Sequence, residues 1–199
     1  MRFSIAASVS AMLLSLASST SAVLDINNWC YEPIYIWQSI DGGCQTGSNQ
    51  ICLGSAGASP LTIPAHTIHT LDLVANGQGT SVKIATNPMM KNGILQFEYT
   101  TANNVFYWDL SDLDGAGPNA VGSPFFNHNV KVSPTGAGLG QGTCQQIRCP
   151  KGTLCQGAYN APEETKTKGC PANTGPMWLN LCEPEAWFAK SKRAVLPRS

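Results

Sequence analysis

Eight cysteines constrain the fold of this chain more than any other feature, and the first of them is Cys30. They follow Met1, an apolar stretch from Ile5 to Leu16 and small residues up to Ala22, which is the layout of a secretory signal peptide. We expect cleavage after Ala22, which leaves 199 − 22 = 177 residues for one domain. Because the secretory pathway is oxidising, an even cysteine count predicts four disulfides rather than a metal cluster.

The charge balance excludes several classes of partner. The 12 Lys and Arg residues match the 12 Asp and Glu residues, so no excess charge favours nucleic acid or an anionic membrane surface. The apolar leader is shorter than the roughly 20 residues that cross a bilayer, so no anchor is expected. His66 and His69 are three residues apart, and on a strand such residues face opposite ways, which argues against a shared metal. We expect a secreted monomer, extracellular or in the cell wall, without metal or cofactor.

Glycine and proline interrupt the chain at short intervals, and the segments between them are β-branched or aromatic, which favours an all-β sandwich. The expected strands are Val23–Asn27, Pro33–Ile40, His69–Leu73, Ser81–Thr86, Ile94–Tyr99, Val105–Leu110, Asn129–Val132 and Met177–Leu181. No internal repeat or second domain is evident. The domain is expected to span residues 23–184. Residues 185–199 are expected to form a disordered tail with an exposed dibasic site at Lys192-Arg193.

Two of these strands predict a hairpin with one apolar and one polar face. Alternation turns six residues toward the core: Leu95, Phe97, Tyr99, Phe106, Trp108 and Leu110. A turn centred on Ala102 and Asn103 sets Leu95 opposite Leu110, Phe97 opposite Trp108 and Tyr99 opposite Phe106. On the outer face, Glu98 and Asp109 are then diagonal neighbours, with backbones about 7 Å apart.

Several motifs follow one another in a fixed order along the chain. They are Asn27-Asn28-Trp29-Cys30, Glu98-Tyr99-Thr100, Tyr107–Gly115, Ala158–Pro162, Thr167–Pro171 and Leu181–Pro184. In this order they resemble the motifs of the thaumatin-like superfamily, and within it the antigenic, yeast-phase-specific branch of fungi. The resemblance spans nearly the whole mature chain and implies a disulfide-stapled thaumatin-like β-sandwich.

The resemblance also implies how the cysteines pair. Its pairs are Cys30 with Cys182, Cys44 with Cys52, Cys144 with Cys170, and Cys149 with Cys155. In larger thaumatin-like proteins the segment matching Cys149 to Cys155 is a cysteine-rich second domain, whereas here only five residues separate these cysteines. That domain is therefore expected to be missing.

The acidic cleft of the family has only a partial counterpart in this chain. Glu98, Asp109 and Asp114 match it, and Asp112 follows in the same loop, whereas the family's basic partner has no match because no Lys or Arg occurs between Val23 and Val82. Without a second domain to wall it, the cleft should become a shallow acidic face.

Two functions fit this acidic face. The first is a non-enzymatic extracellular protein, an effector candidate in host interaction, that binds a β-glucan or other wall polysaccharide, or a protein partner. The alternative is an endo-β-1,3-glucan hydrolase that uses Glu98 and Asp109, whose diagonal placement would suit the roughly 6.5–9.5 Å separation of inverting enzymes. A solvent-open face gives little desolvation to raise either pKa, which favours binding. An ordinary solvated sheet face explains these carboxylates about as well as a glycan site does.

Overall fold

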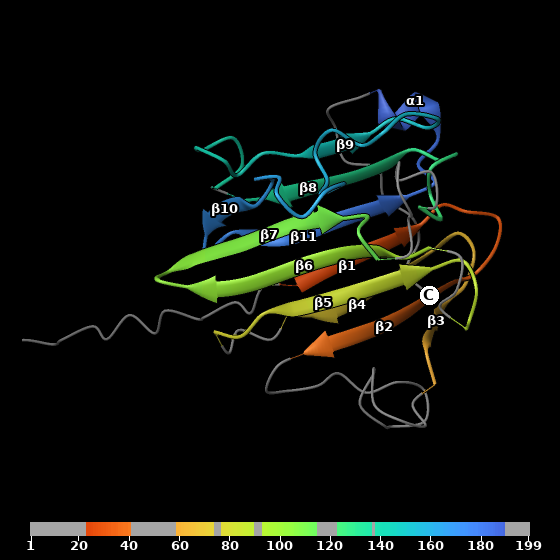
Figure 1. Cartoon of the computed structure of the whole chain (residues 1–199), viewed down its shortest axis with the longest axis horizontal. Helices are drawn as coiled ribbons and strands as arrows, with labels where there is room; N and C mark the ends of the chain where they lie inside the picture. The colour runs from red at the N-terminus through yellow and green to blue at the C-terminus, as the bar shows by residue number, and fades with distance from the viewer. Residues whose placement is uncertain are drawn as a thin grey trace, which may run out of the picture.

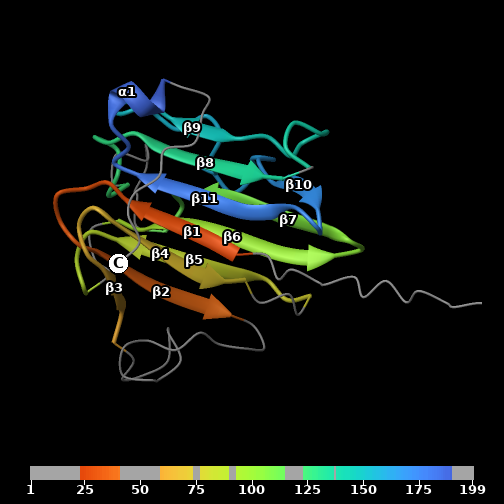
Figure 2. The same ribbon diagram turned by 180° about the vertical axis from the view of Figure 1, so that it is seen from behind.

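The chain forms a sandwich of two β-sheets in a computed structural model, which describes residues 23–40, 59–73, 77–89, 93–114, 123–136 and 138–189. Among these residues, one sheet has the strand order β4-β1-β11-β8-β9 and the other has the order β10-β7-β6-β5-β2-β3. The six-stranded sheet lies toward the viewer in Figure 1, and the five-stranded sheet does so in Figure 2. The all-β class that the sequence predicts is confirmed.

The elements are β1 (Val23–Asn28), β2 (Ile34–Ile40), β3 (Leu61–Ile63), β4 (Thr67–Asp72), β5 (Thr80–Ala85), β6 (Leu95–Ala102), β7 (Val105–Ser111), β8 (Val130–Thr135), β9 (Ile147–Cys149), β10 (Lys168–Pro171), β11 (Gly175–Leu181) and α1 (Glu185–Phe188). Each of the eight expected strands overlaps one of these. The strands that the sequence did not reveal are β3, β9 and β10, which have only three, three and four residues. Segments this short contain too few positions to show a period of two.

The core lies between the sheets, and strand alternation explains which residues fill it. On β1, Leu24 and Ile26 are fully buried between the sheets, and on β11 Leu179 and Leu181 meet them from the neighbouring strand. Burial of an aliphatic side chain of this size stabilises a fold by about 1.5–3 kcal/mol. Each strand also presents its alternate residues on the outer face of its sheet, and these outer faces hold the polar groups considered below.

Three of the four implied disulfides are present in the described residues: Cys30–Cys182, Cys144–Cys170 and Cys149–Cys155. The first joins positions 152 residues apart and ties the end of β1 to the end of β11. The proposed pair of Cys44 and Cys52 lies outside the described residues, as do the expected signal peptide and the Lys192-Arg193 site.

The short helix α1 lies within the segment that we expected to be a disordered tail from residue 185. Phe188 is buried, and the guanidinium of Arg148 lies 5.8 Å from the centre of its ring. Arg148 also donates a hydrogen bond of 2.9 Å to the Phe188 carbonyl oxygen. The ordered structure therefore continues past Pro184, because an aromatic anchor beyond the last cysteine docks on the sandwich.

The β6–β7 hairpin has the expected faces but a different register. Phe97 pairs with Leu110 and Glu98 with Asp109, so our expected pairing is displaced by two residues. The turn is Asn103-Asn104, with φ angles of 51° and 60°, values that suit the two-residue type I′ turns of hairpins. A displacement of two keeps every side chain on its original face, so the hydrophobic pattern alone cannot distinguish the two registers. Glu98 and Asp109 are thus directly opposite rather than diagonal.

Candidate functional site

The outer face of the six-stranded sheet carries a row of polar side chains across three neighbouring strands and the residue that leads into a fourth. Ser81 of β5 pairs with Glu98 of β6, which pairs with Asp109 of β7. Thr167, immediately before β10, donates a hydrogen bond of 3.2 Å from Oγ1 to Oδ2 of Asp109. The residues that precede or follow them on the strands are buried in the core: Val82, Phe97 and Trp108. Alternation therefore turns the polar row outward.

This row lies in a groove of about 430 Å³, which we call the acidic groove. Tyr107 lines the same groove and pairs with Thr100 on one side and Gly169 on the other. The side chain of Tyr107 is 36% exposed. A Cβ atom at Gly169 would lie 3.7 Å from Cε1 of the tyrosine ring, so the glycine leaves this flank of the ring uncovered. The acidic groove thus combines carboxyl groups, hydroxyl groups and an accessible aromatic ring.

Asp109 is the most strongly perturbed of these groups. It is only 9% exposed, and its Oδ1 accepts no hydrogen bond from the residues that the structure describes. The pKa of Asp109 is raised from 3.8 to about 7, first by burial and then by the Glu98 carboxylate, while the hydrogen bond from Thr167 opposes the rise. Our expectation that an open face would give little desolvation is wrong for Asp109, because β10 and Thr167 pack beside it. In mildly acidic surroundings Asp109 is therefore protonated.

Glu98 lies between this acid and an ion pair. Burial raises the pKa of Glu98, the charge of Asp114 raises it further, and Lys83 lowers it. The ammonium nitrogen of Lys83 is 2.5 Å from Oδ2 of Asp114, and both side chains are partly exposed. The family's basic partner has no match in this sequence, but Lys83 supplies a cation beside Asp114. Lys83 is the first residue after the region without Lys or Arg, and the pairing of β5 with β6 brings it to the site.

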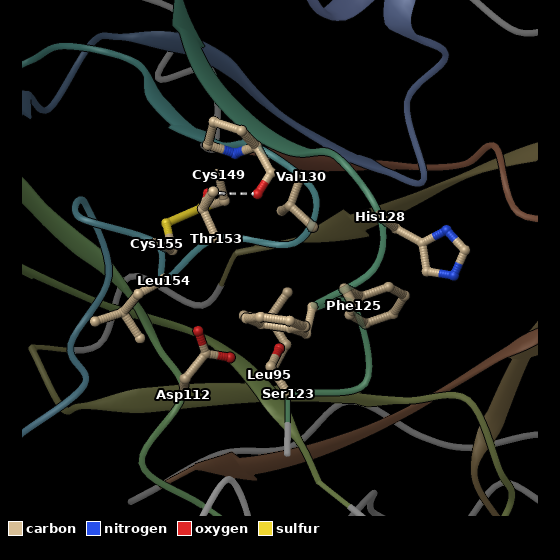
Figure 3. Close-up of a pocket in the computed structure, with 12 residues that line it drawn as sticks. Leu95, Asp112, Ser123, Phe125, His128, Val130, Cys149, Thr153, Leu154 and Cys155 are labelled. Atoms are coloured by element: carbon tan, nitrogen blue, oxygen red, sulfur yellow. Dashed lines mark hydrogen bonds between the residues drawn. A yellow bond between two sulfur atoms is a disulfide. The ribbon is translucent and has the colours of Figure 1, made fainter. Parts of the chain in front are cut away.

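Asp112 does not belong to the acidic groove. It is 5% exposed and lines a separate cavity of about 20 Å³ (Figure 3). The core residue Leu95 and the Cys149–Cys155 bridge line the same cavity. Burial raises the pKa of Asp112, and a hydrogen bond with Ser123 opposes the rise. The chain leaves β7 here, and the Asp112 amide donates to the Tyr159 carbonyl oxygen at 2.9 Å. The predicted acidic face therefore reduces to Glu98 and Asp109, flanked by Asp114, while the cavity has room for about one water molecule.

Sequence reasoning missed three groups that line or flank the acidic groove: Ser81, Thr167 and Lys83. Thr167 lies 58 residues from its partner Asp109, so no local period connects the two. Its motif, Thr167–Pro171, was visible, but nothing in it indicated a hydrogen bond to a carboxyl group on another strand. Only the pairing of β10 with β7 brings this hydroxyl to the site.

The described residues contain no group of three or more His, Cys, Asp or Glu side chains placed to hold a metal ion. His66, one of the two histidines considered above, lies in the turn before β4 with a φ of 56°, and its ring contacts the edge of Tyr31 at 5.3 Å. Within the same part of the chain, none of the helices has the length and apolar character needed to span a membrane.

Comparison with known proteins identifies related sequences. A family model described as the Blastomyces yeast-phase-specific protein matches residues 9–183. An antigenic thaumatin-like protein of Arthroderma benhamiae is 32% identical over 164 residues, which cover 80% of this chain and 71% of that protein. The secreted thaumatin-like protein calA of Emericella nidulans is 28% identical over 160 residues, which cover 78% of each chain.

Among solved structures, the fold is similar to that of the protein elicitor MoHrip2 from Magnaporthe oryzae. The two share 20% sequence identity with a TM-score of 0.57, and the match covers 81% of this chain and 99% of that one. At this identity the likeness concerns the fold alone. The resemblance to thaumatin-like proteins that the motifs indicated is confirmed by the two named sequence relatives.

Proposed function

The chain belongs to the Blastomyces yeast-phase-specific protein family, and from that premise we propose that it is a secreted, non-enzymatic protein that binds an uncharged wall polysaccharide in the acidic groove. The disulfides fit an extracellular protein, and one relative is named as secreted. The observation that carries the proposal is the row of Ser81, Glu98, Asp109 and Thr167 beside the exposed ring of Tyr107.

The chemistry of the acidic groove favours a hydroxyl-rich ligand. A protonated Asp109 can donate a hydrogen bond, and an ionised Glu98 accepts hydrogen bonds from hydroxyl groups. The Ser81 hydroxyl donates to Oε1 of Gln96 at 2.8 Å and can accept a hydrogen bond as well. Tyr107 offers an aromatic face with a polar tip, a combination that suits the apolar face and hydroxyl rim of a sugar ring. The volume of about 430 Å³ falls in the range of about 300–1,000 Å³ for small-ligand sites. It would hold a short stretch of polymer.

The charge of the groove favours an uncharged polymer over an anionic one. The positive charge of Lys83 is balanced by the carboxylate of Asp114, so Glu98 carries the remaining negative charge while Asp109 is protonated. A uronic-acid polymer would be repelled by Glu98, and no free cation lines the groove to compensate in the described residues. A neutral glucan meets no such repulsion.

Binding is tested with insoluble β-1,3-glucan and with soluble laminarin, using the purified mature protein in sedimentation and calorimetric assays. We expect Tyr107→Ala and Asp109→Asn to weaken binding by about tenfold or more, since a loss of 1.4 kcal/mol corresponds to tenfold. Glu163→Gln is the matched control, because Glu163 is an exposed carboxylate in the loop before β10. Equal affinity of Tyr107→Ala and the wild-type protein for every glucan would refute the proposal.

Hydrolysis of the same polymer is a second candidate, and the raised pKa of Asp109 directly opposite Glu98 favours it. Directly opposite residues have Cβ atoms about 4.5–5.5 Å apart. That spacing suits the separation of about 5–5.5 Å in retaining glycosidases better than the wider one of inverting enzymes. Asp109, with a pKa of about 7, would serve as the acid, and Glu98 as the nucleophile.

Catalysis is distinguished from binding by assaying reducing sugar released from laminarin at several pH values. A pure binder releases none, whereas an enzyme releases sugar in the wild type and Glu163→Gln, and loses this activity in Glu98→Gln. If activity is found, the anomer formed first reports the stereochemistry, and the directly opposed pair predicts retention.

A further inference from the structure

A second hollow lies on the opposite side of the sandwich, over β8 and β11 of the five-stranded sheet. It has a volume of about 550 Å³, larger than that of the acidic groove. β8 and β11 lie side by side near the viewer in Figure 2 and pair in antiparallel register, with an irregularity between Gly175 and Trp178. At the end of β8 the chain turns through Gly136, whose φ is 79°. A Cβ atom there would lie 2.9 Å from the Gly175 nitrogen, so this close approach requires glycine.

The floor of this hollow, and the strand next to it, contain buried amide atoms that lack partners. Asn180 lines the hollow and is only 2% exposed; its Nδ2 donates to Oε1 of Glu183 at 3.3 Å, whereas its Oδ1 accepts no hydrogen bond from the described residues. Asn27 lies beside it in register on β1, fully buried, and neither amide atom has a partner within the same part of the chain. Buried amides without partners are uncommon and call for a bound molecule or water. Because Asn27 and Asn180 are adjacent, β1 and β11 together have hydrogen-bonding atoms that no described residue satisfies.

The hollow is uncharged overall. Lys131 is its one charged lining residue among those described, and its ammonium nitrogen lies 2.5 Å from Oε1 of Glu183. Both side chains of this pair are almost fully buried. The ammonium is thus already neutralised, and the site offers no free charge to attract an anion or a cation.

The remaining walls combine hydroxyl and amide groups with apolar surface. Ser133 contributes a half-buried hydroxyl, and Gln145 an exposed amide. When the Gln146 amide is oriented with its carbonyl toward Arg148, that oxygen accepts from the guanidinium at 3.0 and 3.3 Å, which leaves the amide nitrogen as a donor. Trp178 and Leu139 supply the apolar surface. Groups that donate and accept hydrogen bonds around an indole ring fit a molecule with many hydroxyls and an apolar face.

From these observations we propose that the hollow over β8 and β11 is a binding site for an uncharged oligosaccharide, separate from the acidic groove. Its volume fits small-ligand sites, its free hydrogen-bonding groups are neutral, and its floor holds the unpartnered Oδ1 of Asn180. The proposal does not depend on the function of the acidic groove, because the two sites lie on the outer faces of different sheets.

The experiment titrates isotope-labelled protein with hexasaccharides of β-1,3-glucose, β-1,4-glucose, N-acetylglucosamine and mannose, and follows the backbone amides by NMR. An uncharged Gly-Ser hexapeptide and a glucuronic acid oligomer serve as comparison ligands. Ser133→Phe fills the hollow from an outward strand position, and Ser81→Phe fills the acidic groove in the same way. Thr62→Phe, at an exposed position on the edge strand β3, is the matched control for a new surface phenylalanine. A pull-down on insoluble wall polymer separates polymer binding from binding of free oligosaccharide.

We expect at least one hexasaccharide to shift the amides of β8 and β11, and Ser133→Phe to weaken this response about tenfold or more. Ser81→Phe and Thr62→Phe should leave it unchanged. Should Ser133→Phe alter the thermal unfolding curve, Gln145→Ala with Gln146→Ala is the gentler variant, and a smaller loss is expected. The proposal is overturned by the absence of any saccharide response at β8 and β11, by wild-type affinity in both hollow variants, or by preference for the peptide or the glucuronic acid oligomer.

Discussion

Replacement of Asp109 by asparagine should change how the stability of the domain depends on pH. The carboxyl has a folded-state pKa of about 7 against an ordinary value of 3.8. Below about pH 4 it is neutral in both the folded and the unfolded chain, so it contributes nothing there. Between about pH 4 and pH 7 the unfolded chain loses this proton and the folded chain keeps it, so the free energy of unfolding falls as pH rises.

The magnitude follows from the size of the pKa shift. The difference between about 7 and 3.8 is about 3 units, and one unit corresponds to 1.36 kcal/mol, which gives about 4 kcal/mol. Because the groove is open to solvent on one side, we reduce this to about 2–4 kcal/mol. Asparagine keeps an acceptor for the Thr167 hydroxyl but cannot ionise. As pH rises from about 4 to about 8, the free energy of unfolding of Asp109→Asn should therefore increase by about 2–4 kcal/mol relative to that of the wild type.

The assay is urea denaturation of both proteins at several pH values across this range, with the carboxyl carbon of Asp109 followed by NMR to measure its pKa directly. Glu163→Gln is run beside them and should show a constant difference from the wild type. The reasoning is refuted if the difference in free energy of unfolding between Asp109→Asn and the wild type changes by less than about 0.5 kcal/mol from pH 4 to pH 8. Asp109 would then not be held protonated in the folded protein.

Three further predictions concern stability. Lys131→Met should lower the free energy of unfolding, measured by urea denaturation, by about 3–5 kcal/mol because it leaves the buried Glu183 carboxylate unpaired. The double variant with Glu183→Leu should recover much of this loss. If the single and double variants lose the same stability, the pairing argument is refuted. Asn104→Gly should raise the free energy of unfolding by up to about 1 kcal/mol, because glycine adopts the observed φ of 60° more readily. A less stable variant would contradict the type I′ turn. Replacing both Cys30 and Cys182 by alanine should cost about 2–5 kcal/mol or prevent folding at 37 °C, and an unchanged melting curve would show that the bridge contributes nothing.

The sequence determined the faces of the β6–β7 hairpin but not its register. Alternation is a local property, and Leu95, Phe97 and Trp108 are buried as it predicts. Registers that differ by two residues bury the same side chains, so the choice depends on the turn and on packing with other strands. The expected aromatic pair, Phe97 and Trp108, does come into contact, with ring centres 5.9 Å apart, although the two residues are diagonal rather than opposite.

The sequence also identified Glu98 and Asp109 as the candidate pair, together with the bridges that the family resemblance implied. Only the tertiary structure decided what surrounds them. Lys83 reaches Asp114 because β5 pairs with β6, and Thr167 reaches Asp109 because β10 pairs with β7. These contacts join residues 31 and 58 positions apart, so no local pattern encodes them. The pKa of Asp109 has the same origin, since burial is set by strands that meet only when the sheet forms.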